Sequence, residues 1–279
     1  MTIFGIDISN NNGPDVDLAE VAREGFQFVF AKVTEGDGFI DYTWPAYRDA
    51  AHANGLLVAG YHYLRDDCDV DAQAELYLAH LGDAAIMVDF EADSGGIETF
   101  WAFVNAVRAR GRAVSLSYIP RWYWQRIGSP DLSRVPGLIQ SSYVSGSGSA
   151  SALYPGDDSR FWDGFGGKTI DLLQFTDAAV VAGHRVDANA FTGTLDQLRA
   201  LLGTAPTTQG VLMALTDEQQ TDLYSKVLEI WAQLRGPDGQ GWPQLGRNAQ
   251  GESLTLVDAV AHLLEVPVAG QADPGKVAS

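Results

Sequence analysis

Short apolar runs alternate with stretches of helical periodicity through residues 1–203, and this alternation constrains the fold more than any other feature. The runs predicted as strands span residues 26–33, 56–62, 84–91, 113–118 and 170–175. The helical stretches between them include residues 44–53, 71–81 and 97–110. A strand–helix–strand order favours right-handed crossovers and a mainly parallel sheet. With this many units we expect the sheet to close, which predicts an α/β fold of the TIM-like β/α barrel type.

A change of composition after Gly203 predicts a domain boundary. Small and polar residues with one proline fill residues 203–210, which suits a linker. We therefore expect a barrel at 1–203, a linker at 204–212 and a small helical domain at 213–279. In that domain the apolar residues Leu223, Val227, Ile230, Trp231 and Leu234 fall on one helical face. A second helix is expected at about residues 255–265. Two short helices enclose little core, so this domain needs a partner.

Charge and cysteine content exclude several classes of function. The chain of 279 residues has 18 basic and 36 acidic side chains, a net charge of −18, which argues against nucleic acid and anionic membranes as partners. The single cysteine, Cys68, excludes an intramolecular disulfide and a cysteine-rich zinc site. No apolar run is long enough for membrane insertion. The N-terminus lacks the pattern of a signal peptide, so we expect synthesis in the cytoplasm.

Acidic residues mark the predicted strand ends. Asp89 and Glu91 follow an apolar run and, two apart on a strand, point to the same side. Asp7 ends the first strand pattern, and Asp187 is expected to end the last. At the mouth of a parallel barrel such acids suit glycosidic cleavage, which needs a proton donor and a carboxylate. A metal-dependent hydrolase using the same four carboxylates is the chemical alternative, and acids that merely cap strands are the structural one.

Aromatic residues gather near the same predicted strand ends. They are Tyr61, Tyr63, Tyr118, Trp122, Tyr123 and Trp124. Aromatic faces stack on sugar rings, so this grouping favours a carbohydrate groove, although core packing would also explain any one of them. His62, beside Tyr61, is expected to be a hydrogen-bonded core histidine rather than a catalyst.

Six short motifs together resemble glycoside hydrolase family 25, the lysozymes that cleave peptidoglycan between N-acetylmuramic acid and N-acetylglucosamine. The motifs are GIDIS at 5–9, AKVTEG at 31–36, GYHY at 60–63, VDFE at 88–91, QFT at 174–176 and VDANAF at 186–191. They occur in the family's order over most of the first 203 residues. Leu173 replaces a tryptophan that the family often has before the glutamine, and residues 138–143 lack the tryptophan usual in that strand. Neither departure changes one of the four carboxylate residues.

The resemblance implies a distorted β/α barrel with a glycan groove and no metal or organic cofactor. Its motifs place the general acid at Glu91. They give Asp89 an assisting role, in which it orients the substrate's acetamido group, and they make Asp7 and Asp187 part of the same acidic cluster. Neighbouring-group participation by that acetamido group and inversion are both open at this point. The sugar site would be lined by Glu35, Tyr61, Tyr118 and Gln174. The implied partner is the glycan strand of bacterial peptidoglycan.

The C-terminal part resembles tails on endolysins of phages that infect actinobacteria. The matching runs are GWPQLG at 241–246 and LTLVDA at 254–259. This resemblance implies an endolysin that reaches the host wall through a holin pore and lyses the cell. The partner of the C-terminal helices could be a second copy, the barrel or a cell-wall polymer, and we expect either a homodimer or binding to the cell wall. The alternative is a non-catalytic wall-binding or virion structural protein that keeps the barrel.

Overall fold

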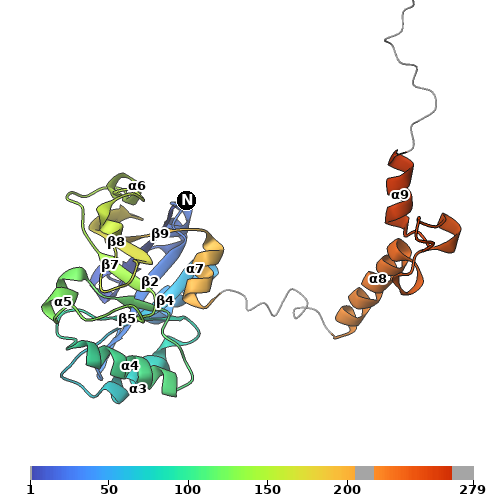
Figure 1. Cartoon of the computed structure of the whole chain (residues 1–279). Helices are drawn as coiled ribbons and strands as arrows, with labels where there is room; N and C mark the ends of the chain where they lie inside the picture. Colours follow the sequence, from blue (N-terminus) through green and yellow to red (C-terminus); the bar gives the residue numbers. More distant parts are fainter. Residues whose placement is uncertain (1, 205–216, 266–279) are drawn as a thin grey trace, which may run out of the picture. The chain divides into compact units, whose positions relative to one another are not determined.

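A closed barrel of mixed strands forms the first part of the chain in the computed structural model, which describes residues 2–204 and 217–265. Figure 1 shows most of its elements. The barrel strands are β1 (Thr2–Ile8), β2 (Phe28–Glu35), β4 (Leu57–Tyr63), β5 (Ala85–Asp89), β6 (Leu116–Tyr118), β7 (Leu138–Ser141), β8 (Leu172–Val181) and β9 (His184–Thr192). The predicted α/β barrel is therefore confirmed.

The strand order explains why the barrel is distorted. Neighbours are parallel from β1 through β2, β4, β5, β6 and β7 to β8. The last strand, β9, is antiparallel to both β8 and β1 and closes the ring. Ala182 and Gly183, with φ of 50° and 78°, form the two-residue turn between β8 and β9, and positive φ at both positions suits a tight hairpin.

This hairpin corrects one expectation about the acids. Asp187 does not end a parallel strand, because it lies inside the antiparallel strand β9. A short extra strand, β3 (Phe39–Ile40), pairs antiparallel with the end of β2. Glu91 also lies beyond its strand, since β5 ends at Asp89.

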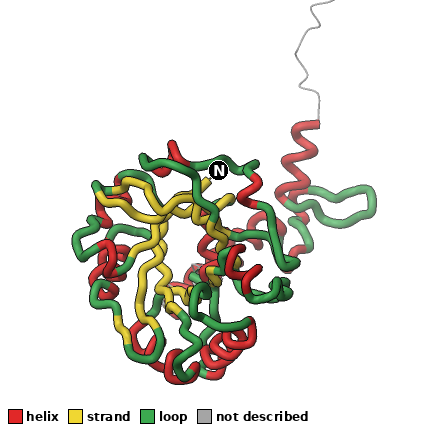
Figure 2. The backbone as a smooth tube through the Cα atoms, turned by 90° about the vertical axis from the view of Figure 1, so that its left-hand side faces the viewer, coloured by secondary structure: helices red, strands yellow, loops and turns green. Residues whose placement is uncertain are grey.

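Helices surround the ring of strands, as Figure 2 shows. They are α1 (Leu18–Arg23), α2 (Trp44–Ala53), α3 (Val70–Leu81), α4 (Ile97–Ala109), α5 (Arg121–Arg126), α6 (Ala150–Leu153) and α7 (Leu195–Leu202), with short 3-10 turns at η1 (Asn10–Asn12) and η2 (Arg160–Trp162). Asp17, Asp69 and Thr194 accept hydrogen bonds from the first backbone N–H groups of α1, α3 and α7, which fixes where these helices begin.

The apolar core has two layers. Between strands and helices lie large buried side chains such as Trp44, Tyr77 and Phe100. Inside the ring, Phe28 and Phe30 pack with residues from the other strands. Gly5 is required by this inner packing, because a Cβ there would lie 2.2 Å from the Phe28 ring.

His62 belongs to the outer layer, which confirms the prediction of a core histidine. Its ring nitrogens lie 2.8 Å from Thr34 Oγ1 and 3.1 Å from Gln73 Oε1. Its ring stacks on Phe103 with a centroid distance of 4.8 Å. Burial disfavours the charged imidazolium and lowers the pKa of His62 to about 3.

The chain divides into two compact units, Met1–Pro206 and Thr207–Ser279. The second contains α8 (Asp217–Arg235), α9 (Leu256–Glu265) and the short turns η4 (Pro237–Gly239) and η5 (Pro243–Leu245). The predicted linker, 204–212, lies outside the described residues except for Thr204. No helix in the described ranges combines the length and apolar character needed to span a bilayer.

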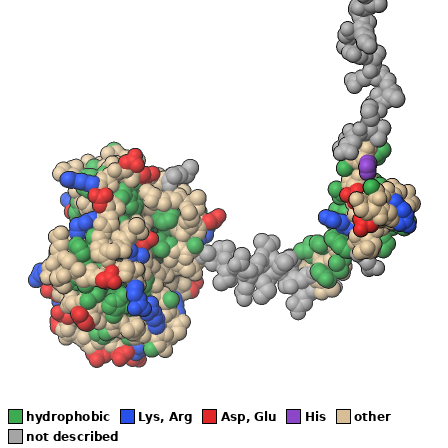
Figure 3. Space-filling model, viewed as in Figure 1, with side chains coloured by type: hydrophobic (Ala, Val, Ile, Leu, Met, Phe, Trp, Pro, Cys, Tyr) green, Lys and Arg blue, Asp and Glu red, His purple; other side chains and the backbone are tan. Residues whose placement is uncertain are grey.

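Apolar side chains of the second unit remain exposed, and several are visible as green patches on this unit in Figure 3. On α8 they are Leu223, Tyr224, Val227, Leu228, Ile230, Trp231 and Leu234. On α9 they are Leu256, Val257, Val260 and Leu263. Leu254 is the only large apolar side chain that the described residues of this unit bury.

Candidate active site

A cavity of about 560 Å³ opens where the parallel strands end. Asp89, Tyr118 and Ser141 are the last residues of β5, β6 and β7, and all three line it. The full lining consists of Asp7, Asn11, Lys32, Tyr61, Tyr63, Met87, Asp89, Glu91, Tyr118, Trp122, Ser141, Tyr143, Gln174 and Asp187. The carboxyl ends of barrel strands are where loops and side chains of this fold build active sites.

Asp89 and Glu91 form one acidic pair in this cavity. Asp89 is 8% exposed, and its Oδ1 is buried without a hydrogen-bond partner. Burial and the neighbouring charge of Glu91 raise the pKa of Asp89 well above its usual value. Burial and the charge of Asp7 raise the pKa of Glu91 as well. The pair therefore holds a proton at higher pH than two isolated carboxyls would.

The turn after β5 fixes how Glu91 is presented. Its backbone N–H donates to Ser94 Oγ at 3.1 Å, and that hydroxyl donates to the carbonyl oxygen of Leu64 at 2.6 Å. Glu91 remains partly exposed, whereas Asp89 is buried. Glu91 is thus the member of the pair that a large substrate can reach from solvent.

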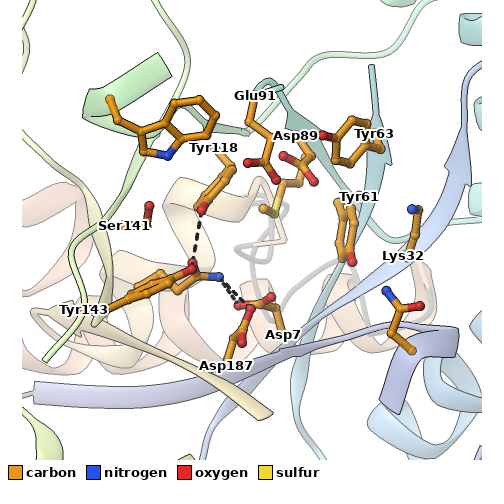
Figure 4. A pocket seen from close by; sticks show the side chains of 14 residues that line it. Asp7, Lys32, Tyr61, Tyr63, Asp89, Glu91, Tyr118, Ser141, Tyr143 and Asp187 are labelled. Atoms are coloured by element: carbon orange, nitrogen blue, oxygen red, sulfur yellow. Dashed lines mark hydrogen bonds between the residues drawn. The ribbon is translucent and has the colours of Figure 1, made fainter. Parts of the chain in front are cut away.

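Asp7 and Asp187 form the second acidic pair, which Figure 4 shows across the cavity from the first. The two residues are paired in register between β1 and β9, and their side chains share a hydrogen bond. Burial, together with the charge of Asp7, raises the pKa of Asp187 to about 9. Asp187 is therefore protonated near neutral pH and donates to Asp7. Asp7 Oδ2 also accepts from Asn189 Nδ2 at 2.6 Å.

Gln174 connects this pair to two tyrosines. Its Nε2 donates to Asp7 Oδ2 at 2.8 Å and to Asp187 Oδ2 at 3.3 Å. Its Oε1 accepts from the hydroxyls of Tyr118 at 3.1 Å and Tyr143 at 2.6 Å. The dashed lines in Figure 4 trace bonds of this network. With both ends of the amide occupied, Gln174 has one orientation and holds the acids and the tyrosines in register.

Lys32 is the only Lys or Arg side chain in the lining of this cavity. Its Nζ forms an ion pair with Glu35 and lies 5.2 Å from the Tyr63 ring centroid and 5.3 Å from that of Phe39. The positive charge lowers the pKa of both Asp89 and Glu91, against the effect of burial. Lys32 therefore opposes the retention of protons by the acidic pair.

Most of the residues expected from the sequence share this cavity. Asp7, Asp89, Glu91, Asp187, Tyr61, Tyr118 and Gln174 all line it. Glu35 does not, because it lies against Lys32 and Arg65 and lines a neighbouring surface cavity instead. Glu35 therefore contacts the cavity lining only through its ion pair with Lys32.

The aromatic residues divide into two groups. Tyr63 and Trp122 line the cavity with Tyr61 and Tyr118. Tyr123 is buried and donates to the Gly95 carbonyl oxygen at 2.7 Å, so it belongs to the scaffold. Trp124 packs on Phe165 at a centroid distance of 5.0 Å and donates to the Pro130 carbonyl oxygen.

Among the residues that the sequence did not assign to the site, Lys32, Tyr143 and Asn189 interact with residues that it did assign. Lys32 lies within an apolar run, so the sequence indicates only a strand residue whose charged end reaches solvent. Tyr143 is the last residue of the segment 138–143, which the sequence distinguishes only by its lack of tryptophan. Asn189 belongs to the motif VDANAF, and its position two residues after Asp187 on a strand puts both side chains on one face.

The same geometry bears on metal binding. In the ranges 2–204 and 217–265, no group of three or more histidine, cysteine, aspartate or glutamate side chains is arranged to hold a metal ion. Asp7 and Asp187 face amide donors and each other, so their oxygens are already engaged by hydrogen bonds.

Two family models match the sequence. The model "Glycosyl hydrolases family 25" matches residues 6–184, and the model "Rv3766 C-terminal domain" matches residues 215–269. The first match covers the barrel with its cavity, and the second covers the described helices of the second unit.

Two similar proteins each match only a part of the chain. An uncharacterized protein of Mycobacterium tuberculosis, Rv3766, is 58% identical over 77 residues, which are 28% of this chain and 28% of that protein. An autolytic lysozyme of Clostridium acetobutylicum is 34% identical over 95 residues, 33% of this chain and 29% of that protein. The chain thus matches less than a third of the length of these curated relatives.

Among solved structures, a family GH25 lysozyme from Aspergillus fumigatus is 27% identical, with a TM-score of 0.58. The similarity covers 72% of this chain and 99% of that one.

Proposed function

The chain belongs to glycosyl hydrolase family 25, and from this premise we propose that it hydrolyses the β-1,4 bond between N-acetylmuramic acid and N-acetylglucosamine in peptidoglycan. The observation that supports this most is the placement of two acidic pairs, Asp89 with Glu91 and Asp7 with Asp187, in one cavity at the strand ends. Glycosidic cleavage needs a retained proton and a group that stabilises positive charge at the sugar carbon.

In this proposal Glu91 is the general acid. Its raised pKa keeps a proton available, and its partial exposure lets it approach the glycosidic oxygen. The proton passes to that oxygen as the bond to the anomeric carbon breaks. The departing sugar leaves with a free hydroxyl group.

Asp89 assists from the buried side. Its unpartnered Oδ1 is suited to accept a hydrogen bond from the substrate's acetamido N–H. So oriented, the acetamido carbonyl oxygen bonds to the anomeric carbon as the leaving group departs. Water then attacks that carbon, the bond from the carbon to the acetamido oxygen breaks, and one proton of the water passes to Glu91, which restores the enzyme and the acetamido group. This route retains the anomeric configuration.

The remaining residues position the sugar. Asp7, Asp187 and Gln174 form a rigid wall opposite the catalytic pair, with Tyr118 bonded to Gln174. Tyr61 supplies an aromatic surface for a sugar ring. Glu35 acts by holding Lys32 in place.

The experiment uses purified actinobacterial peptidoglycan and the full chain, with and without a chelator. Mass spectrometry identifies the sugar that gains each new reducing end, and proton NMR gives its configuration. We expect muramic acid ends of retained configuration in both conditions. Glucosamine ends would assign the other bond. Loss of activity in chelator would favour the metal-dependent alternative, and wall binding with no new ends would favour a non-catalytic protein.

Host cell-wall lysis by a phage endolysin is the proposed biological role. Its support is the resemblance of residues 241–246 and 254–259 to tails of such endolysins. The proposed route to the wall is a holin pore. Expression in a bacterial host with a cleavable wall tests this: we expect lysis only when a pore-forming holin or a membrane permeabiliser is added. Lysis without either would contradict the route.

For the C-terminal unit we propose a homodimer formed by α8. Leu223, Val227, Ile230 and Leu234 are exposed and recur at intervals of four, three and four residues, the spacing of a coiled-coil seam. The unit buries only Leu254 among the large apolar side chains in its described part. A second copy of α8 would cover this seam by the same packing on both sides.

Light scattering tests the dimer. We expect the full chain to have twice its 30.0 kDa mass and the Val227→Glu, Ile230→Glu double variant to be a monomer. Leu228→Glu, exposed on α8 but off the seam, is the matched control and should remain dimeric. A monomeric wild-type chain, or a seam variant that still dimerises, would contradict the proposal. If the seam variant instead loses binding to purified walls, the seam binds the wall.

A further inference from the structure

A second polar cavity lies beside the proposed active site. It has a volume of about 290 Å³ and is lined by Arg121, Gln140, Ser142, Arg160, Phe161 and Asp163. At two places, residues adjacent in the sequence line the two cavities. Ser141, between Gln140 and Ser142, lines the central cavity, and so does Trp122, which follows Arg121. Alternate residues of a strand face opposite sides, so the end of β7 contributes to both cavities.

The donors in this second cavity are fixed by the scaffold. The Gln140 side chain is buried, at 4% exposure, and its Oε1 accepts the backbone N–H of Arg121 at 2.8 Å. The amide nitrogen of Gln140 forms no hydrogen bond within the described residues, so it is available as a donor. Arg121 lies 4.6 Å over the Phe165 ring and donates to the Asp163 carbonyl oxygen. Both contacts hold its guanidinium at the rim.

The charges in this cavity are unusual for so acidic a chain. Within the described ranges, neither Arg121 nor Arg160 has an ion pair with an acidic side chain. Asp163 also lines the cavity, so two cations and one anion leave a net positive charge. An amide donor and two guanidinium groups without an acidic partner, lining one cavity, form a suitable receptor for a carboxylate.

We propose that Arg121, Gln140 and Arg160 form a subsite for a carboxylate of the peptide that branches from the muramic acid. The inference rests on the proposed function, because only a glycan held in the central cavity brings such a peptide to this rim. The peptide leaves the sugar ring through the lactyl group, and its carboxylates are the anions that the substrate carries. The subsite would let the enzyme distinguish peptide-bearing glycan from bare polysaccharide.

The test compares two forms of one substrate. Soluble peptidoglycan fragments of at least two disaccharide-peptide units, which contain the proposed bond, are used either with free peptide carboxylates or after carbodiimide coupling to ammonia, which converts those carboxylates to amides. Arg160→Gln is the test variant, because this exposed side chain has no ion pair to lose. Arg108→Gln, an exposed arginine on α4 with no place in either cavity, is the matched control.

For Arg160→Gln we expect a rise in KM of about threefold on the free-carboxylate substrate, the effect of one exposed charge pair, with kcat unchanged and no change on the amidated form. An equal effect on both substrates, or none on either, would overturn the proposal. Calorimetric binding of both fragments to chains carrying Glu91→Gln, with and without Arg160→Gln, gives a second readout. A preference for the carboxylate form that Arg160→Gln abolishes would support the subsite even if no turnover occurred, and no preference would refute it. Turnover by the wild-type chain separately reports on the proposed function.

Discussion

Asp7 and Asp187 lie opposite each other in the antiparallel pairing of β1 with β9, and their carboxyls share a hydrogen bond. Two buried acids in contact are stable here because one stays protonated and because Gln174 and Asn189 donate to Asp7. The strand that brings Asp187 there is the one that closes the barrel against the parallel direction. The distortion of the barrel and the architecture of the site therefore have the same origin.

The proton shared by this pair makes stability depend on pH. The folded chain keeps a proton on Asp187 up to about pH 9, whereas an ordinary aspartate, as in the unfolded chain, loses it near 3.8. Because the folded state binds more protons between these values, the free energy of unfolding falls as pH rises through this window. Asp187→Asn cannot ionise and can still donate to Asp7, so we expect a shallower fall.

Urea denaturation at several pH values measures this effect. Asp158→Asn, an exposed aspartate, serves as the control and should keep the wild-type slope. Equal slopes in the wild-type chain and Asp187→Asn would show that Asp187 is ionised in the folded protein.

Gln174 should contribute to stability through both ends of its amide. Gln174→Leu removes the acceptor of the Tyr118 and Tyr143 hydroxyls and one donor to Asp7. We expect a loss of about 2–4 kcal/mol in the free energy of unfolding, since buried polar groups lose their partners. Tyr143→Phe removes one of these bonds from a half-exposed side chain and should cost about 1 kcal/mol or less. Chemical denaturation compares the two, and equal losses would mean that the network does not depend on Gln174.

Lys32 and Glu35 should shift the pH dependence of hydrolysis in opposite directions. The Lys32 charge lowers the pKa of Asp89 and Glu91, so Lys32→Gln should move the whole pH–rate profile to higher pH, by about one unit. The Glu35 charge raises the pKa of Asp89, so Glu35→Gln should move the acidic limb to lower pH.

The profiles of kcat/KM against pH for both variants test these two opposite shifts. A shift of both variants in the same direction would show that they act by disturbing the fold rather than through charge. An unchanged profile for Lys32→Gln would remove Lys32 from the electrostatics of the site.

The local periodicity of the sequence predicts much of this fold. Residues 44–53 form α2 within the predicted bounds, because apolar spacing and a following Asn-Gly stop are local signals. The antiparallel β8–β9 closure was not predicted, since it depends on a positive φ at Ala182. That residue type gives no hint of such a conformation. The orientation of Glu35 is a similar case: its motif indicates that it is near the site but not that its side chain lies against Lys32 and Arg65.

The site, like the fold, has one part that the sequence predicts and another that it does not. The strand-end carboxylates could be predicted from the sequence because Asp89 and Glu91 directly follow an apolar run and two residues apart on a strand point to the same side. The charges that shift the pKa values of Asp89 and Glu91 come from distant segments: Lys32 lies on β2, and Asp7 lies on β1. Those neighbours are determined by tertiary packing, which no local pattern encodes.

The most direct test of the account is the rate of peptidoglycan hydrolysis by Glu91→Gln. The substitution keeps the size of the side chain and removes its transferable proton. We predict that the release of muramic acid reducing ends falls by at least about a hundredfold, while circular dichroism and the unfolding midpoint stay close to those of the wild-type chain. A folded Glu91→Gln protein that cleaves peptidoglycan at the wild-type rate would contradict the assignment of Glu91 as the proton donor.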